Sequence, residues 1–255
     1  MPAPIAVQLY SLRDALKEDF EGIIRQVAEM GYVGVETAGV YGESPASATR
    51  LFEELGLQVC SAHVGLPLGD RKTEILETVA ALHTTNVIVP WLPPDEFTSE
   101  DKIKAVCDRL NEGALVAQEN GLTLAYHNHD WEFRPAESLG GKTPFEVMLT
   151  YLDPSVQFEI DTYWVKVGGS NPVQIVRECG ERAPLLHIKD GPLDKEQAML
   201  AVGAGVMNFP PIVAAGEGYT RWLIVELDRA DTDMVEAVQQ SYTYLIQNGL
   251  AQGKQ

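Results

Sequence analysis

Residues 156–161 read VQFEID, an apolar run that turns acidic where it ends. Three further apolar runs end in an acidic or imidazole group, namely LTLAYH at 122–127, LLHIKD at 185–190 and LIVELD at 223–228. Short, nearly continuous apolar runs indicate strands that are buried on both faces of a parallel sheet. In a (β/α)₈ barrel the active site is built at the C-terminal ends of the strands, so polar residues there indicate chemistry.

Eight such runs alternate with helical patterns along the chain. We expect strands at Ile5–Tyr10, Val33–Glu36, Gln58–His63, Val87–Pro90, Thr123–His127, Gln157–Asp161, Leu185–Lys189 and Leu223–Glu226. Helix signals lie between them, such as the cap sequence Thr143-Pro144-Phe145-Glu146. The weakest expected helix is a short one around Pro211–Ala215. The 255 residues match the roughly 250 of one barrel. We therefore predict an α/β protein with a single (β/α)₈ TIM barrel that covers residues 1–255 as one domain.

Motifs of other α/β folds are absent from the sequence. No GxGxxG follows the first expected strand, and Gly203-Ala204-Gly205 comes too late in the chain to replace it. The chain also contains no phosphate-binding lysine loop and no GxSxG nucleophile turn. An open dinucleotide-binding sheet is therefore the weaker interpretation.

Composition limits the partners. The formal net charge of −18 disfavours nucleic acid and anionic membrane surfaces. The N-terminus shows no secretory signal, and no apolar run is long enough to span a membrane. Cys60, Cys107 and Cys179 are far apart and odd in number, as in a reduced compartment. We expect a cytoplasmic protein, with a homo-oligomer left open beside a monomer.

Three strand ends offer ligands for a divalent ion. They are Asp161, His187 and Glu226, which together with one histidine of YHNHDWEF form a mixed nitrogen and oxygen donor set. Alternatives remain for each. Asp161 could cap a helix or form a salt bridge, and Glu159, two residues earlier, could take its place as ligand. His187 could be a satisfied core histidine.

Acid–base groups lie close to these ligands in the sequence. His127 and His129 share a face if the strand persists, so either could bind the ion while the other transfers protons. Glu226 is also a candidate base, although it could instead pair with Arg229. Lys189 shares the face of His187 and is a third catalytic candidate, which could act as a base or bind a substrate oxygen or phosphate. The alternatives are a pair with Asp161 or a place on the surface.

Further polar and aromatic residues end other expected strands. Glu36, His63 and Trp91 should face the same mouth, and Glu132 lies in the dense histidine segment. We take these four as candidate substrate-binding residues. The ordinary alternatives are a loop carboxylate for Glu36, a core histidine for His63 and a packing role for Trp91.

At these residues the chain resembles the sugar phosphate isomerase/epimerase group of xylose-isomerase-like barrels. The resemblance includes VQLYSLRD at 7–14, GYVGVE at 31–36, YHNHDWEF at 126–133, the EID, HIKD and VELD series, and VGAGVMNFPPI at 202–212. It implies one divalent ion, commonly Mn²⁺, with Co²⁺, Mg²⁺ or Zn²⁺ as alternatives. The family's ligand set falls on His127, Asp161, His187 and Glu226. Similar epimerases carry glutamate where this chain has His127, which leaves one face without its usual acid–base group.

We therefore expect a metal-dependent isomerase or epimerase of a small sugar or sugar phosphate. It would remove a proton next to a carbonyl and stabilise an enediolate. Within the same scaffold, an inosose or keto-sugar dehydratase or lyase is the alternative, because it begins with the same step. A non-catalytic sugar-binding barrel is a further alternative. An abasic-site endonuclease would need more ligands and a basic DNA-binding face.

Overall fold

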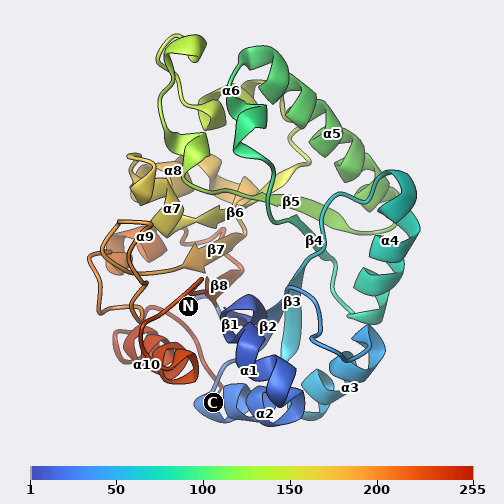
Figure 1. Ribbon diagram of the computed structural model, residues 1–255, viewed down its shortest axis with the longest axis vertical. Helices are drawn as coiled ribbons and strands as arrows, with labels where there is room; N and C mark the ends of the chain where they lie inside the picture. The colour runs from blue at the N-terminus through green and yellow to red at the C-terminus, as the bar shows by residue number, and fades with distance from the viewer. Residues whose placement is uncertain (1, 255) are drawn as a thin grey trace.

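The computed structural model describes residues 2–254 and shows eight parallel strands that close into a barrel (Figure 1). Neighbours in sequence are neighbours in the sheet, and β8 pairs with β1 to complete the ring. The strands are β1 Ile5–Gln8, β2 Gly34–Thr37, β3 Gln58–His63, β4 Asn86–Val89, β5 Thr123–His127, β6 Gln157–Asp161, β7 Leu185–Ile188 and β8 Trp222–Val225. The (β/α)₈ prediction is confirmed. The expected domain limits, residues 1 and 255, lie outside the described residues.

Helices surround the barrel on its outside (Figure 1). They are α1 Arg13–Glu18, α2 Phe20–Met30, α3 Pro45–Glu54, α4 Lys72–Ala81, α5 Glu100–Glu119, α6 Pro144–Tyr151, α7 Thr162–Val167, α8 Pro172–Cys179, α9 Phe209–Ala215 and α10 Met234–Gln247. The capping box expected from the sequence is present, because Thr143 and Glu146 satisfy each other's backbone N–H groups. No helix within residues 2–254 is long and apolar enough to cross a membrane.

The observed elements differ from the expected ones mainly at their ends. The first strand stops at Gln8 rather than Tyr10, because the Gln8 side chain accepts a hydrogen bond from the Tyr10 amide and starts a 3₁₀ turn at Leu9–Leu12. The short helix expected around residues 211–215 begins earlier, at Phe209. These shifts are of the size usual for element boundaries.

The N-terminal half of the barrel interior is apolar. Its inward side chains are those of Ala6, Cys60, Ile88, Ala125, Leu185 and Ile224, with Trp222 packed against them. Gly34 makes room for this Trp, since a Cβ at residue 34 would lie 2.8 Å from its ring. This packing closes one end of the barrel and leaves the other end for polar groups.

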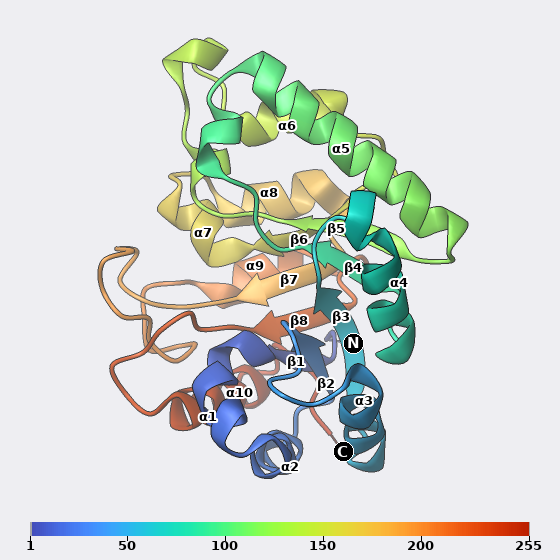
Figure 2. The same cartoon turned by 45° about the vertical axis from the view of Figure 1, so that its right-hand side comes forward.

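The C-terminal ends of the strands carry the long connections. Figure 2 shows β7 and β8 pointing the same way, with the β7–α9 loop leaving from that side. The Asp190 carboxylate anchors this loop by accepting hydrogen bonds from the backbone N–H groups of Gly191, Gly203, Gly205 and Met207. These four hydrogen bonds fix the start and the end of the β7–α9 loop to each other.

Candidate active site

A cavity of about 510 Å³ opens at the C-terminal ends of the strands. This volume falls in the range of small-molecule sites. The residues that line it are Tyr10, Ala38, His63, Pro90, Trp91, His127, His129, Lys189, Glu226 and Asp228. Six of the residues singled out in the sequence therefore meet at one mouth, as a (β/α)₈ barrel requires of its active site.

Four buried side chains at this mouth can hold a divalent ion. His127 ends β5, Asp161 ends β6, His187 lies on β7 and Glu226 follows β8. One ligand atom from each lies within 4.8 Å of all the others. His187 Nδ1 is 2.8 Å from Glu226 Oε2, and His127 Nε2 is 3.8 Å from Asp161 Oδ2. We call this set the mouth group.

Asp161 shows why the mouth group fits a cation. Its Oδ1 accepts a hydrogen bond from the Trp164 amide and caps α7, so the expected capping alternative is present. Asn128 fixes its backbone by exchanging two hydrogen bonds with it. Within residues 2–254, however, Asp161 Oδ2 is buried and accepts no hydrogen bond. A buried carboxylate oxygen left in this state is costly unless a cation compensates it.

Lys189 supplies part of that compensation. The side chain is 1% exposed, which contradicts the surface alternative, and it forms the expected pair with Asp161, with Nζ 3.1 Å from Oδ2. Nζ also lies 2.6 Å from Glu226 Oε2 and 3.0 Å from Asp228 Oδ1. Burial alone would lower the pKa of Lys189, but the three carboxylates outweigh it and hold the pKa well above its usual value. Three carboxylates thus share one ammonium.

Glu226 is ionised in this setting. Burial favours the neutral acid, but Lys189 and His187 outweigh it and hold the pKa of Glu226 well below its usual range. The alternative pair with Arg229 is wrong, because that guanidinium donates to the backbone carbonyls of Lys195 and Gln197. A charged Glu226 is the form that can bind a divalent ion.

His129 lies in the loop after β5, beyond the end of the strand. Its ring stacks on Trp131, with ring centroids 4.4 Å apart and planes at 9°. Burial first, and the Lys189 ammonium second, lower the pKa of His129 to about 3. The side chain is therefore a neutral imidazole at neutral pH. His127 belongs to the mouth group, whereas His129 lies outside it and lines the cavity.

The remaining candidates occupy three different environments. Trp91 is 52% exposed at the rim and meets Trp131 edge to face. Glu132 does not line the cavity. It is buried behind His129, where it accepts hydrogen bonds from the Tyr126 hydroxyl and the His129 amide. In this position Glu132 holds the histidine loop.

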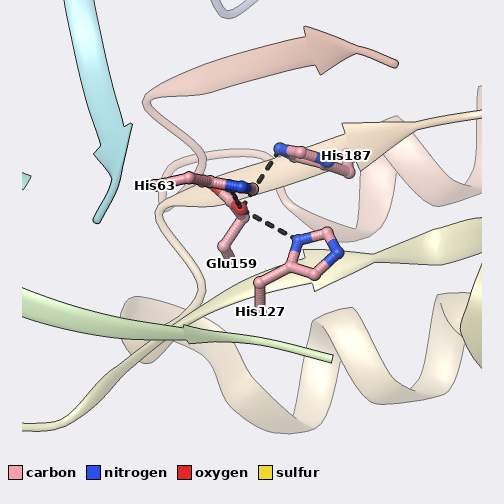
Figure 3. A group of neighbouring side chains, drawn as sticks. All are labelled: His63, His127, Glu159 and His187. Carbon is pink, nitrogen blue, oxygen red and sulfur yellow. Dashed lines mark hydrogen bonds and ion pairs between the residues drawn. The ribbon is translucent and has the colours of Figure 1, made fainter. Parts of the chain in front are cut away.

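Glu36 and His63 lie at the base of the cavity. His63 lines the cavity, whereas Glu36 is fully buried beneath it and accepts hydrogen bonds from Gln8, Ser61 and His187. Glu159 lies beside them, and with His63, His127 and His187 it forms a second set of possible ligands (Figure 3). We call this second set the inner group.

Sequence reasoning missed several participants. Tyr10 and Asp228 line the cavity, and Gln8 and Ser61 hold Glu36. Asp228 could have been found by strand alternation, since it lies two residues after Glu226. Tyr10 follows the first strand, where mouth residues are expected. Nothing in the local sequence marks Ser61, because its partner lies on another strand.

The fold agrees with comparisons to known proteins. A family model described as "Xylose isomerase-like TIM barrel" matches residues 24–247. An inosose dehydratase from Geobacillus kaustophilus is 26% identical over 265 residues, which cover 87% of this chain and 82% of the relative. A second inosose dehydratase, from Clostridium beijerinckii, is 22% identical, and the alignment covers 89% of this chain and 88% of that relative.

A solved structure shows the same architecture over nearly the whole length. A sugar phosphate isomerase/epimerase from Parabacteroides distasonis superposes with a TM-score of 0.83 at 25% identity, covering 99% of this chain and 96% of that one. Because the family model covers most of the chain, the assignment does not depend on any single relative. This protein belongs to the xylose isomerase-like TIM barrel family.

Proposed function

We propose that this protein binds one divalent ion through the mouth group and dehydrates an inosose or a closely related keto-sugar. An inosose is a cyclohexane polyol with one ring carbon oxidised to a ketone. The observation that carries the proposal is the mouth group itself, with its four ligand atoms within 4.8 Å of one another. It lies in a cavity of about 510 Å³ beside a neutral imidazole.

The donor set of two imidazoles and two carboxylates suits a divalent ion, and we propose Mn²⁺ first, with Co²⁺, Mg²⁺ or Zn²⁺ as alternatives. When bound, such an ion supplies positive charge that stabilises a developing oxyanion on a substrate carbonyl. His127, Asp161, His187 and Glu226 would hold it. Lys189 adds a second positive charge at the same wall of the cavity.

His129 is the proposed acid–base residue. Its neutral imidazole accepts the proton from the carbon next to the carbonyl and becomes a short-lived imidazolium, because the burial that lowers its pKa to about 3 disfavours the charged ring. The same proton then passes to the hydroxyl on the next carbon, which leaves as water, so His129 returns to its neutral state. One group serves both halves of this elimination. Stacking on Trp131 holds the imidazole plane in place.

Epimerisation is less well supported by the same geometry. It needs acid–base groups on opposite faces of the carbon. β8 lies three strands from β5 in the ring, so Glu226 is placed across the mouth from His129. Glu226, however, is engaged by Lys189 at 2.6 Å and by His187 at 2.8 Å. Two inosose dehydratases also align over 87% and 89% of this chain. Both observations favour elimination, while isomerisation of a small sugar is the second candidate.

The substrate is proposed to be a small sugar or cyclitol. A cytoplasmic location is part of the proposal, since Cys60, Cys107 and Cys179 are all free thiols in the structure.

The test is proton exchange and dehydration in deuterated water. Manganese-loaded protein is incubated with an inosose and, separately, with ketohexoses, and the products are followed by NMR. We expect the inosose to lose water, and the His129→Ala variant to lose this activity while keeping its ion. Deuterium exchange without dehydration would favour the isomerase or epimerase alternative. No ion binding and no exchange on any substrate would leave a non-catalytic binding barrel.

A further inference from the structure

We propose that Glu159 is a positioning residue that fixes which nitrogen of His127 and which nitrogen of His187 faces the ion. This inference rests on the proposed mouth group. It gives a role to Glu159, which no step of the proposed reaction uses. From the sequence alone, Glu159 is only a rival of Asp161 for the ligand position.

One oxygen of Glu159 faces three imidazole rings (Figure 3). Glu159 Oε2 lies 2.7 Å from His63 Nε2, 2.9 Å from His127 Nδ1 and 3.2 Å from His187 Nε2. The glutamate is fully buried on β6. A carboxylate can only accept hydrogen bonds, so His63 Nε2 and His127 Nδ1 carry the protons of their hydrogen bonds to Glu159. His187 Nε2 donates to Glu36 at 2.7 Å, with Glu159 as the second carboxylate beside it.

Protons at these positions decide which nitrogens remain free. With Nδ1 of His127 donating to Glu159, its Nε2 is left unprotonated on the side of Asp161, 3.8 Å away. His187 Nε2 faces inward, hydrogen-bonded to Glu36 Oε2 at 2.7 Å and 3.2 Å from Glu159 Oε2. Its Nδ1 is hydrogen-bonded to Glu226 Oε2 at 2.8 Å, and an ion bound there would replace the proton of that hydrogen bond. The ring nitrogens that do not face the inner carboxylates thus belong to the mouth group. A hydrogen bond from the second ring nitrogen to a carboxylate is the usual way proteins orient a histidine ligand.

Glu36 performs only part of this role. Its Oε2 lies 2.7 Å from His187 Nε2 and 3.1 Å from His63 Nε2. It is held in turn by Gln8 at 2.6 Å and Ser61 at 2.5 Å. Among the described residues, the hydrogen bond of His127 Nδ1 goes to Glu159. His187 therefore has two inner carboxylates, whereas His127 depends on one.

The inner group could instead be read as a second ion site, since its ligand atoms are also within 4.8 Å of one another. It shares His127 and His187 with the mouth group. Ions in both groups at once would require both rings to bind through both nitrogens and lose every ring proton. Orientation of the ligands by Glu159 needs no such state, because each neutral ring keeps one proton and offers one free nitrogen.

The experiment measures ring protonation and ion affinity, without substrate. Nitrogen-15 NMR of histidine-labelled, zinc-loaded full-length protein reports which ring nitrogens carry protons. A chelator competition gives the dissociation constant for Mn²⁺. Glu159→Met removes the acceptor, Glu159→Gln keeps a neutral acceptor, and Glu132→Gln is a control with the same burial and no contact to a ligand ring.

We expect protonated Nδ1 on His127 and protonated Nε2 on His187 in the parent protein. Glu159→Met should weaken Mn²⁺ binding about 10- to 100-fold. Glu159→Gln should recover part of this loss, and Glu132→Gln should bind as the parent does. A folded Glu159→Met protein with unchanged affinity would overturn the proposal, and so would two zinc ions per chain.

The parent protein alone also tests the inference, should the Met variant not fold. A proton on His127 Nε2 in the zinc-loaded parent would contradict it. Failure of this kind is distinguishable from failure of the proposed function. Dehydration of an inosose can proceed whichever residue orients the ligands, and correct ring protonation can be present in a protein that does not turn over inososes.

Discussion

The two halves of the barrel interior are built on the same strands and differ in almost every other respect. On β8, Ile224 points into the apolar half, and Glu226, two residues later, points into the mouth group. On β7 the corresponding pair is Leu185 and His187. Two residues along a strand return to the same face of the sheet, about 7 Å further along the barrel. The barrel changes from packed core to charged site within that distance.

This contrast shows where stability and function separate. Burial of apolar groups at one end stabilises the fold by about 25 cal/mol per Å². At the other end, burial removes water from ionised groups, and only partners of opposite charge offset the free-energy cost of that desolvation. We therefore expect substitutions in the apolar half to change stability with the ion site intact, and substitutions at the mouth to change ion binding first.

The largest effect is expected from Asp161→Asn. The amide oxygen can still cap α7 through the Trp164 amide, so the fold should persist. The ion loses a charged ligand, and Mn²⁺ affinity should fall by more than about 100-fold, which exceeds the usual cost of losing an outer partner. Elemental analysis should find about one ion per chain in the parent and almost none in the variant, with dehydration lost as well. If the Asp161→Asn variant retained the ion, the ion would bind outside the mouth group.

Lys189→Met should separate the stability of the metal-free and metal-loaded forms. It removes the ammonium that lies within 3.1 Å of Asp161, Glu226 and Asp228. Loss of one partner from a buried ion pair costs about 3–5 kcal/mol, so the metal-free variant should unfold more easily. Removal of the competing positive charge should also tighten Mn²⁺ binding. Thermal unfolding with and without Mn²⁺ tests the lower stability of the metal-free variant and its tighter Mn²⁺ binding. Equal stability of metal-free parent and variant would show that the buried carboxylates do not need the charge of Lys189.

Much of this arrangement could be predicted from local sequence, because each strand is short, apolar and polar at its end. Asp161, His187 and Glu226 were predicted as ligands, and the structure brings them together with His127. The role of His129 could not be separated from that of His127, since spacing does not show that β5 ends at His127. The contact between Glu36 and His187 joins residues 151 positions apart, and closure of the barrel creates it. Burial of Lys189 depends on the same closure.

Ile224→Ala tests the apolar half directly. The side chain is fully buried, and its loss leaves a cavity between the barrel strands. Substitutions of this kind cost about 2–5 kcal/mol. Denaturant unfolding should show this loss, while the Mn²⁺ dissociation constant of the folded protein should stay within a few-fold of the parent value. If the variant is fully folded and still binds Mn²⁺ much more weakly than the parent, the two halves are coupled through β8.

Glu132→Gln should have the smallest effect on ion binding and should change stability in a way that depends on pH. Burial raises the pKa of Glu132 to about 7, although the hydrogen bond from Tyr126 acts in the opposite direction. A carboxyl group whose folded-state pKa is raised favours folding while it is protonated. Its contribution is present below the unfolded pKa of about 4.3 and is lost as pH rises through 7.

Glutamine mimics the protonated acid, since its amide can donate to the Tyr126 oxygen while its carbonyl accepts from the His129 amide. The stability of the variant relative to the parent should therefore rise between pH 4.3 and pH 7, by up to about 4 kcal/mol. Unfolding free energies of metal-free parent and variant across this range test the sign. A difference that stays constant with pH would show that Glu132 remains ionised behind His129, and the histidine loop would then be held by a charged acceptor.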